Sequence, residues 1–145
     1  MTGVISLNEQ QFKKIEAAAE ADYPAECCGL LVGLIEAGNY MVTRVVPSLN
    51  IKAEQAKDRF EIDPQTHIDL ERELRGASDQ IIGHYHSHPD HPPNPSETDL
   101  KMAYGPALIW LIASVNDGKF ADLKAHQINE STQQFEEITL SITSA

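Results

Sequence analysis

The spacing of apolar residues along the chain predicts a mixed sheet with helices packed against it. The segment 8–22 has apolar residues at helical spacing, with Asn8 as N-cap. A second helix is expected over 63–75, because Asp63 can act as N-cap and Pro64 suits the first helical position. A third helix is expected over 96–104. The run 29–35 is almost continuously apolar, which is typical of a strand buried on both faces. Further apolar or alternating runs predict strands at 4–7, 40–46, 59–62, 80–85, 108–115, 120–128 and 135–142.

Turn signals connect these elements into a single fold. Ala37-Gly38-Asn39 lies between two predicted strands and predicts a hairpin, and Asp117-Gly118 does the same farther along the chain. The polar stretch 47–58 predicts a loop. No repeat or low-complexity tract divides the 145 residues, a length typical of one domain. We therefore expect one α/β domain over 1–145, in which a mixed sheet is flanked by helices.

Composition narrows the functional classes. The chain carries 22 acidic and 11 basic residues and no basic run, which argues against nucleic acid, because a phosphate backbone is bound by clustered Lys and Arg. No apolar run approaches the roughly 20 residues of a membrane helix, and no signal-peptide pattern is present. Cys27 and Cys28 are adjacent, a poor geometry for a structural disulfide, and are interpreted as small buried residues. These features predict a cytoplasmic protein with no membrane partner.

The segment 86–99 reads H-S-H-P-D-H-P-P-N-P-S-E-T-D and carries the candidate chemistry. His86 and His88 are two apart at the end of a predicted strand, so both imidazoles point to one face and can reach one ion. Asp99 lies one turn into the predicted helix, and a proline-rich loop, 89–95, connects that helix to the strand. Two imidazoles and a carboxylate are typical ligands of a catalytic zinc, which leaves its fourth position to water. The segment therefore predicts one zinc ion per chain.

Two of these positions also allow another interpretation. Ser96 and Asp99 fit a helix capping box, which competes with metal binding for the Asp99 carboxylate, whereas Ser96 can both cap the helix and face the site. A zinc hydrolase also needs a proton acceptor near its water. Glu26, just before the buried strand, is the candidate, although a glutamate at such a junction is usually solvated.

The remaining histidines receive simpler interpretations. His84 shares the strand face of His86 by alternation, and we expect it to support the ligands or to line the cleft, because a fourth protein ligand would close the site. His67, His91 and His126 are interpreted as ordinary surface or loop histidines. Of these, His91 is near enough in sequence to touch a substrate.

Together these residues resemble the JAMM (MPN+) metalloprotease family. The pattern of that family is an upstream Glu, then H-[ST]-H-P, a Ser after seven intervening residues and an Asp after two more. The positions that meet it here are Glu26, His86, Ser87, His88, Pro89, Ser96 and Asp99. The resemblance extends to 26–33, Asn50 and 60–64, and so covers most of the chain. One departure is His84, where relatives often carry Trp.

The resemblance implies a fold and a division of labour. The fold is a cytidine-deaminase-like α/β sandwich with zinc at the sheet edge. The metal ligands are His86, His88 and Asp99. Glu26 takes the proton of the water and passes it to the leaving amine, and Ser96 stabilises the oxyanion of the tetrahedral intermediate.

The resemblance also implies a partner. The C-C-G-L-L-V-G segment, 27–33, is similar to a short bacterial and archaeal branch of the family. Members of that branch are associated with ubiquitin-like β-grasp sulfur carrier proteins that end in Gly-Gly. They trim residues beyond the diglycine, or release an amino acid such as cysteine from it. An extended tail can add as a strand beside the active site, and loops 47–58 and 89–95 are the candidate walls of that groove.

Other functions compete with this hypothesis. A non-catalytic scaffold, as in family members that lack the metal ligands, is disfavoured by the complete ligand set. A zinc deaminase needs H-x-E with P-C-x-x-C, and neither occurs in the chain. An isopeptidase of the deubiquitinase type, acting on protein conjugates, stays open. The sequence does not separate trimming from amino-acid release.

Overall fold

The chain is described by a computed structural model over residues 3–51, 60–95 and 108–144. Its elements are β1 (Val4–Asn8), α1 (Glu9–Asp22), β2 (Cys28–Glu36), β3 (Asn39–Ser48), α2 (Pro64–Glu73), β4 (Gln80–Pro89), β5 (Ile109–Asn116), β6 (Lys119–Asn129) and β7 (Gln134–Thr143). Except for β4, which runs past its predicted end at Tyr85 to Pro89, each lies close to its predicted range. The expected strand 59–62 is reduced to one bridge between Asn50 and Ile62, and residue 59 lies outside the described residues. The predicted helix 96–104 also lies outside them.

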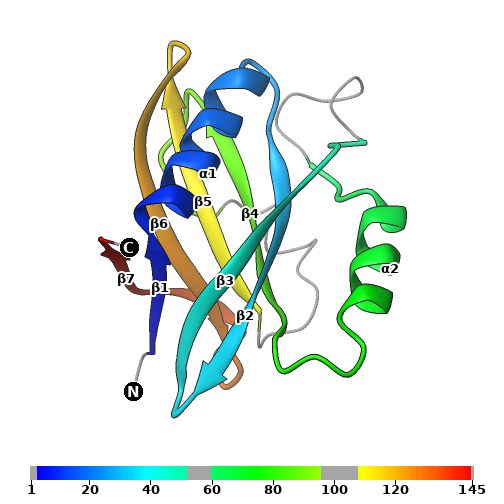
Figure 1. Ribbon diagram of the computed structural model, residues 1–145. Coiled ribbons are helices and arrows are strands. Elements are labelled where there is room, and N and C mark those ends of the chain that lie inside the picture. The colour runs from blue at the N-terminus through cyan, green and yellow to red at the C-terminus, as the bar shows by residue number, and fades with distance from the viewer. Residues whose placement is uncertain (1–2, 52–59, 96–107, 145) are drawn as a thin grey trace.

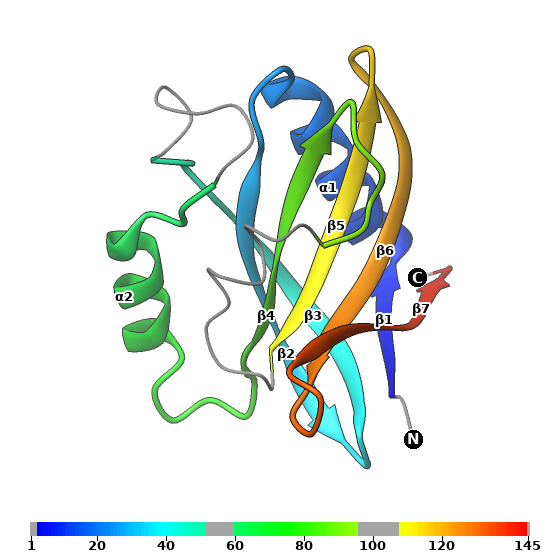
Figure 2. The ribbon, with the colours of Figure 1, turned by 180° about the vertical axis from the view of Figure 1, so that it is seen from behind.

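The strands form one mixed sheet that closes on itself. Their order is β1-β3-β2-β4-β5-β6-β7, and β1 pairs in parallel with both β3 and β7. β4 and β5 are also parallel, whereas the other neighbours are antiparallel. Figure 2 shows β7 crossing at the lower end of the molecule to reach β1. The mixed α/β character is confirmed, but this ring of strands does not confirm the expected cytidine-deaminase-like sandwich.

The two helices lie in different places. α1 crosses one face of the sheet, while α2 lies to the side, next to β2 and β3 (Figure 1). α1 begins as predicted at Asn8, whose Oδ1 accepts a hydrogen bond from Gln11 N at 2.8 Å. α2 begins at Pro64, with the Asp63 side chain accepting from Gln65 N. No helix among the described residues is both long and apolar enough to cross a membrane.

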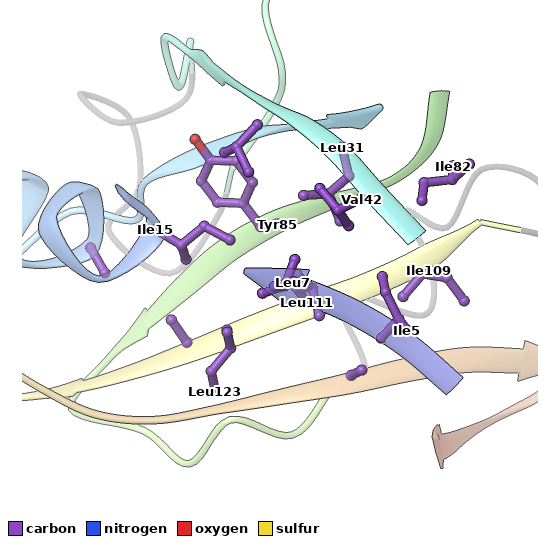
Figure 3. Packing of buried hydrophobic residues seen from close by; sticks show 14 of the residues in the cluster. Ile5, Leu7, Ile15, Leu31, Val42, Ile82, Tyr85, Ile109, Leu111 and Leu123 are labelled. Carbon is purple, nitrogen blue, oxygen red and sulfur yellow. The ribbon is translucent and has the colours of Figure 1, made fainter. Parts of the chain in front are cut away.

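β2 is buried on both faces from Cys28 to Gly33, so the predicted buried run 29–35 is confirmed only in part, because Leu34 is partly exposed and Ile35 is exposed. Leu31 points into the main core with Ile15 of α1 and Tyr85 of β4 (Figure 3). Leu30 and Val32 point the other way and pack with Leu70 of α2. This alternation separates two faces of β4 as well. Tyr85 lies on the α1 face, so its strand neighbours at 84 and 86 lie on the opposite face.

The hydroxyl of Tyr85 is buried and has no hydrogen-bond partner among the described residues. A buried polar group without a partner costs about 1–3 kcal/mol of stability. We expect Tyr85→Phe to raise the free energy of unfolding, measured by urea denaturation, by about 1 kcal/mol. The matched control is Tyr40→Phe, because the Tyr40 hydroxyl accepts a hydrogen bond from Gln127 Nε2 at 2.9 Å and its removal should destabilise the protein. A loss of stability in Tyr85→Phe would contradict this expectation.

Candidate active site

The two histidines of the motif lie inside β4. The sequence predicts a strand that ends at Tyr85, but β4 continues to Pro89, because it pairs with β5 as far as Val115. His86 is fully buried and His88 nearly so. Both lie on the face opposite α1. In Figure 2 the segment that follows β4 folds back over this face.

The two imidazoles converge. His86 Nε2 and His88 Nε2 are 3.1 Å apart, and His88 Nδ1 lies 2.9 Å from Pro92 O. A carbonyl oxygen only accepts hydrogen bonds, so this contact needs a proton on His88 Nδ1, and in the neutral ring Nε2 then carries the lone pair. A metal-binding histidine typically has this arrangement, with the other ring nitrogen donating to a carbonyl or carboxylate. The pair therefore fits the zinc that the sequence predicts.

An aromatic cluster fixes the ring of His86. Phe60 stacks on it, with ring centroids 4.2 Å apart and an interplanar angle of 15°. Trp110 meets the edge of His86 and packs more closely against His84, at 4.3 Å between centroids. His84 is thus a buried member of this cluster, and its predicted role beside the ligands stays a prediction. Sequence reasoning assigned no role to Phe60 or Trp110, and only the family resemblance over 60–64 pointed to Phe60.

Glu26 is buried, with 3% of its surface exposed, so it is not solvated as a glutamate at such a junction usually is. Asn50 holds its backbone, donating from Nδ2 to Glu26 O at 2.9 Å while accepting from Glu61 N. Ser87 fixes the next residue, because its Oγ accepts from Cys27 N at 2.8 Å and its N–H donates to Cys27 O. The pairing of β2 with β4 begins at Cys28 opposite His86, and continuing its antiparallel register by two residues would set the backbone of Glu26 level with His88. Ser87 and Asn50 therefore fix the backbone around the predicted base.

Two predicted site residues, Ser96 and Asp99, lie outside the described residues. Within residues 3–51, 60–95 and 108–144, no three His, Cys, Asp or Glu side chains form a group that could hold a metal. The third ligand stays a prediction on Asp99, and so does the choice between metal binding and helix capping there.

A pocket of ≈ 740 Å³ reaches Glu26 from the side of α1, and Asp22 and Cys27 also line it. A second pocket of ≈ 740 Å³ lies between α1, β6 and β7 and contains none of the predicted site residues. Burial raises the pKa of the thiols of Cys27 and Cys28 to about 12, so both are protonated at neutral pH. They are buried, as predicted, and are not nucleophiles.

His126 was predicted to be an ordinary surface or loop histidine, and this is wrong. It is 4% exposed on β6, and its Nε2 lies 2.9 Å from Pro93 O. Alternation along β6 could not reveal this burial. The face of β6 that carries His126 is covered by the loop that follows β4, which lies far from His126 in the sequence. His67 and His91 are exposed, as predicted, and His67 pairs with Glu71 on α2.

Burial lowers the pKa of His126, so unfolding below the ordinary pKa near 6.5 is coupled to proton uptake by this side chain. Its neutral form stabilises the fold fully above that value, and this contribution is lost as the pH falls towards its folded pKa. We expect the unfolding free energy of the metal-free protein to fall more steeply between pH 7.5 and 5.5 than that of His126→Gln. Equal pH dependence in urea titrations of the two proteins would contradict this.

Comparisons with known proteins identify the family of the chain. A model of the prokaryotic homologs of the JAB domain matches residues 8–129. The chain is 35% identical to a desampylase of Haloferax volcanii over 124 residues, 86% of this chain and 83% of the relative. It is 30% identical to a CysO-cysteine peptidase of Mycobacterium tuberculosis over 112 residues, 77% of this chain and 74% of the relative. A solved structure from Desulfitobacterium hafniense superposes with a TM-score of 0.83 at 29% identity, covering 97% and 94% of the two chains.

The family match spans most of the chain and contains Glu26, His86, His88, Ser96 and Asp99. The predicted resemblance to JAMM (MPN+) proteins is therefore confirmed at the level of the family. This protein belongs to the prokaryotic JAB-domain family.

Proposed function

We propose that this protein is a zinc-dependent peptidase that hydrolyses the bond after the C-terminal Gly-Gly of a ubiquitin-like sulfur carrier protein. The observation that carries the proposal is the buried His86–His88 pair with Nε2 atoms 3.1 Å apart. Glu26 is also buried and directly precedes Cys27, which bonds to Ser87 between the two histidines. The names of two relatives, a desampylase and a CysO-cysteine peptidase, support hydrolysis of the same class of bond.

Each residue has a distinct task in this mechanism. His86 and His88, with Asp99 from the following segment, would hold the metal. Zinc, when bound, lowers the pKa of a coordinated water and polarises the scissile carbonyl. The Glu26 carboxylate would accept a proton from the attacking water and deliver it to the leaving amine. Ser96 donates to the oxyanion, a contribution of the kind worth about 10²–10³ in turnover.

The surface beside Glu26 suits an extended tail. Leu49 and Ile51 are 75% and 44% exposed, and they flank Asn50, which donates to Glu26 O. Exposed apolar side chains so near a catalytic residue favour contact with apolar residues of the carrier's tail. Both residues belong to the predicted groove wall 47–58, of which residues 47–51 are described and 52–58 lie outside the described part of the chain.

The experiment uses the zinc-loaded protein and two substrates built on one carrier. The first carries a single cysteine after the Gly-Gly, and the second joins the Gly-Gly to a lysine side chain through an isopeptide bond. Intact mass is followed for wild type and for Glu26→Gln. Loss of the added group by wild type alone, ending at Gly-Gly, is the expected result.

The two substrates separate the remaining alternatives. Faster cleavage of the isopeptide-linked substrate favours action on protein conjugates, and faster loss of cysteine favours amino-acid release. A wild-type protein that binds zinc and cleaves neither substrate would overturn the proposed substrate. A protein that binds no zinc would revive the non-catalytic scaffold.

A further inference from the structure

The loop 89–95 follows the predicted ligand His88 and leads to the predicted residues Ser96 and Asp99. Four of its seven residues are prolines, which have no backbone N–H. The loop therefore has few backbone N–H groups that could donate to its own carbonyls. Those carbonyls need donors from elsewhere in the protein. Pro93 is itself buried, so its carbonyl would be costly to leave without a donor.

Two imidazoles supply those donors to consecutive carbonyls. His88 Nδ1 lies 2.9 Å from Pro92 O, and His126 Nε2 lies 2.9 Å from Pro93 O. The first imidazole comes from β4 and the second from β6, two strands away in the sheet. Burial lowers the pKa of His126, which keeps its ring neutral with Nε2 as the donor.

The start of the loop is held separately. Asp90 N donates to Val115 O, and its carboxylate accepts from Tyr23 O–H at 2.6 Å and from Asp117 N at 2.8 Å. Asp90 has φ +59°, in the left-handed region, and these bonds hold it there. With Asp90 fixed, the only other side-chain bonds to the loop among the described residues are those of His88 and His126.

We propose that His126 is a positioning residue for His88, acting through the Pro92–Pro93 pair. Pro93 O anchors to His126, the rigid proline pair sets the direction of Pro92 O, and Pro92 O sets the proton position and the ring orientation of His88. Without His126 the carbonyl of Pro92 is free to turn away, and His88 then loses the bond that keeps its Nε2 lone pair on the metal side. The inference rests on the proposed function only in naming His88 as a ligand of the metal.

The test compares His126→Phe, which keeps a buried ring and removes the donor, with His126→Gln, which keeps an N–H donor. In the metal-free protein, ¹⁵N chemical shifts of the His88 ring report which nitrogen is protonated. We expect the Nδ1–H form in wild type, a mixture in His126→Phe, and a return towards Nδ1–H in His126→Gln. The zinc dissociation constant, from competition with a chromophoric chelator, should rise about 10–100-fold in His126→Phe, with partial recovery in His126→Gln.

Ile128→Ala is the matched control, because Ile128 is buried on the same strand and makes no bond to the loop. It should lose stability yet keep the His88 proton position and the zinc affinity of wild type. Equal weakening of zinc in Ile128→Ala and His126→Phe would show a general effect of destabilisation and overturn the proposal. An unchanged His88 tautomer in His126→Phe would overturn it too. If wild type binds no zinc, the proposed function fails, while the tautomer measurement still decides the role of His126.

Discussion

Replacing Glu26 by glutamine is expected to lower kcat/KM by about 10²–10⁴-fold and to leave the zinc content unchanged. Glutamine has the shape of glutamate, so the bonds that hold the backbone of residues 26 and 27, from Asn50 and Ser87, stay in place. The amide has no basic oxygen that can take the proton of the water. The effect should appear in kcat, because binding of the carrier tail does not need the charge.

The measurement is the rate of product formation by intact mass, together with zinc content by elemental analysis. Glu36→Gln is the matched control, because Glu36 is exposed at the far end of β2, the strand that follows Glu26. Retained turnover in Glu26→Gln would remove Glu26 as the base. Lost zinc in that variant would instead give Glu26 a role in holding the metal.

Removing the His88 side chain is expected to abolish zinc binding. Outer groups that only orient a metal ligand cost about 10–100-fold in affinity when lost, so loss of a ligand itself should exceed that range. His88→Ala is a sharper test than His86→Ala, because it leaves the stack of Phe60 on His86 intact. It also leaves Pro92 O without its hydrogen-bond donor, so the loop 89–95 should be more mobile in the metal-free protein.

Zinc affinity by chelator competition and the unfolding free energy of the metal-free variant are measured together. His67→Ala on the exposed face of α2 controls for the loss of one imidazole. Zinc binding of wild-type strength in a folded His88→Ala protein would refute the ligand assignment. Zinc loss in both variants would show that the assay reports surface histidines.

Local patterns were sufficient to predict most of the elements. Asn8 and Asp63 cap the two described helices as predicted, because capping depends on a few neighbouring residues. The end of β4 could not be predicted in this way. It extends to Pro89 only because β5, about 25 residues later in the chain, provides a partner strand.

The candidate site also contains residues that could be predicted from local patterns and contacts that could not. His86, His88 and Glu26 could be named from residue type and spacing, since metal chemistry restricts both. The contacts that position them could not, because Phe60 reaches His86 and His126 reaches Pro93 across the fold. Alternation along β6 indicated which residues share a face but not that the proline-rich loop covers the face of His126.

The pairing of β1 with β7 has a consequence for folding during synthesis on the ribosome. Val4 pairs with Thr139 and Asn8 with Thr143. The ring of strands can therefore close only after β7 has been synthesised. Until then β1 and β6 each present an open edge, and open edges are templates for pairing with other chains. We expect nascent chains stalled between β6 and β7 to aggregate more readily than completed ones.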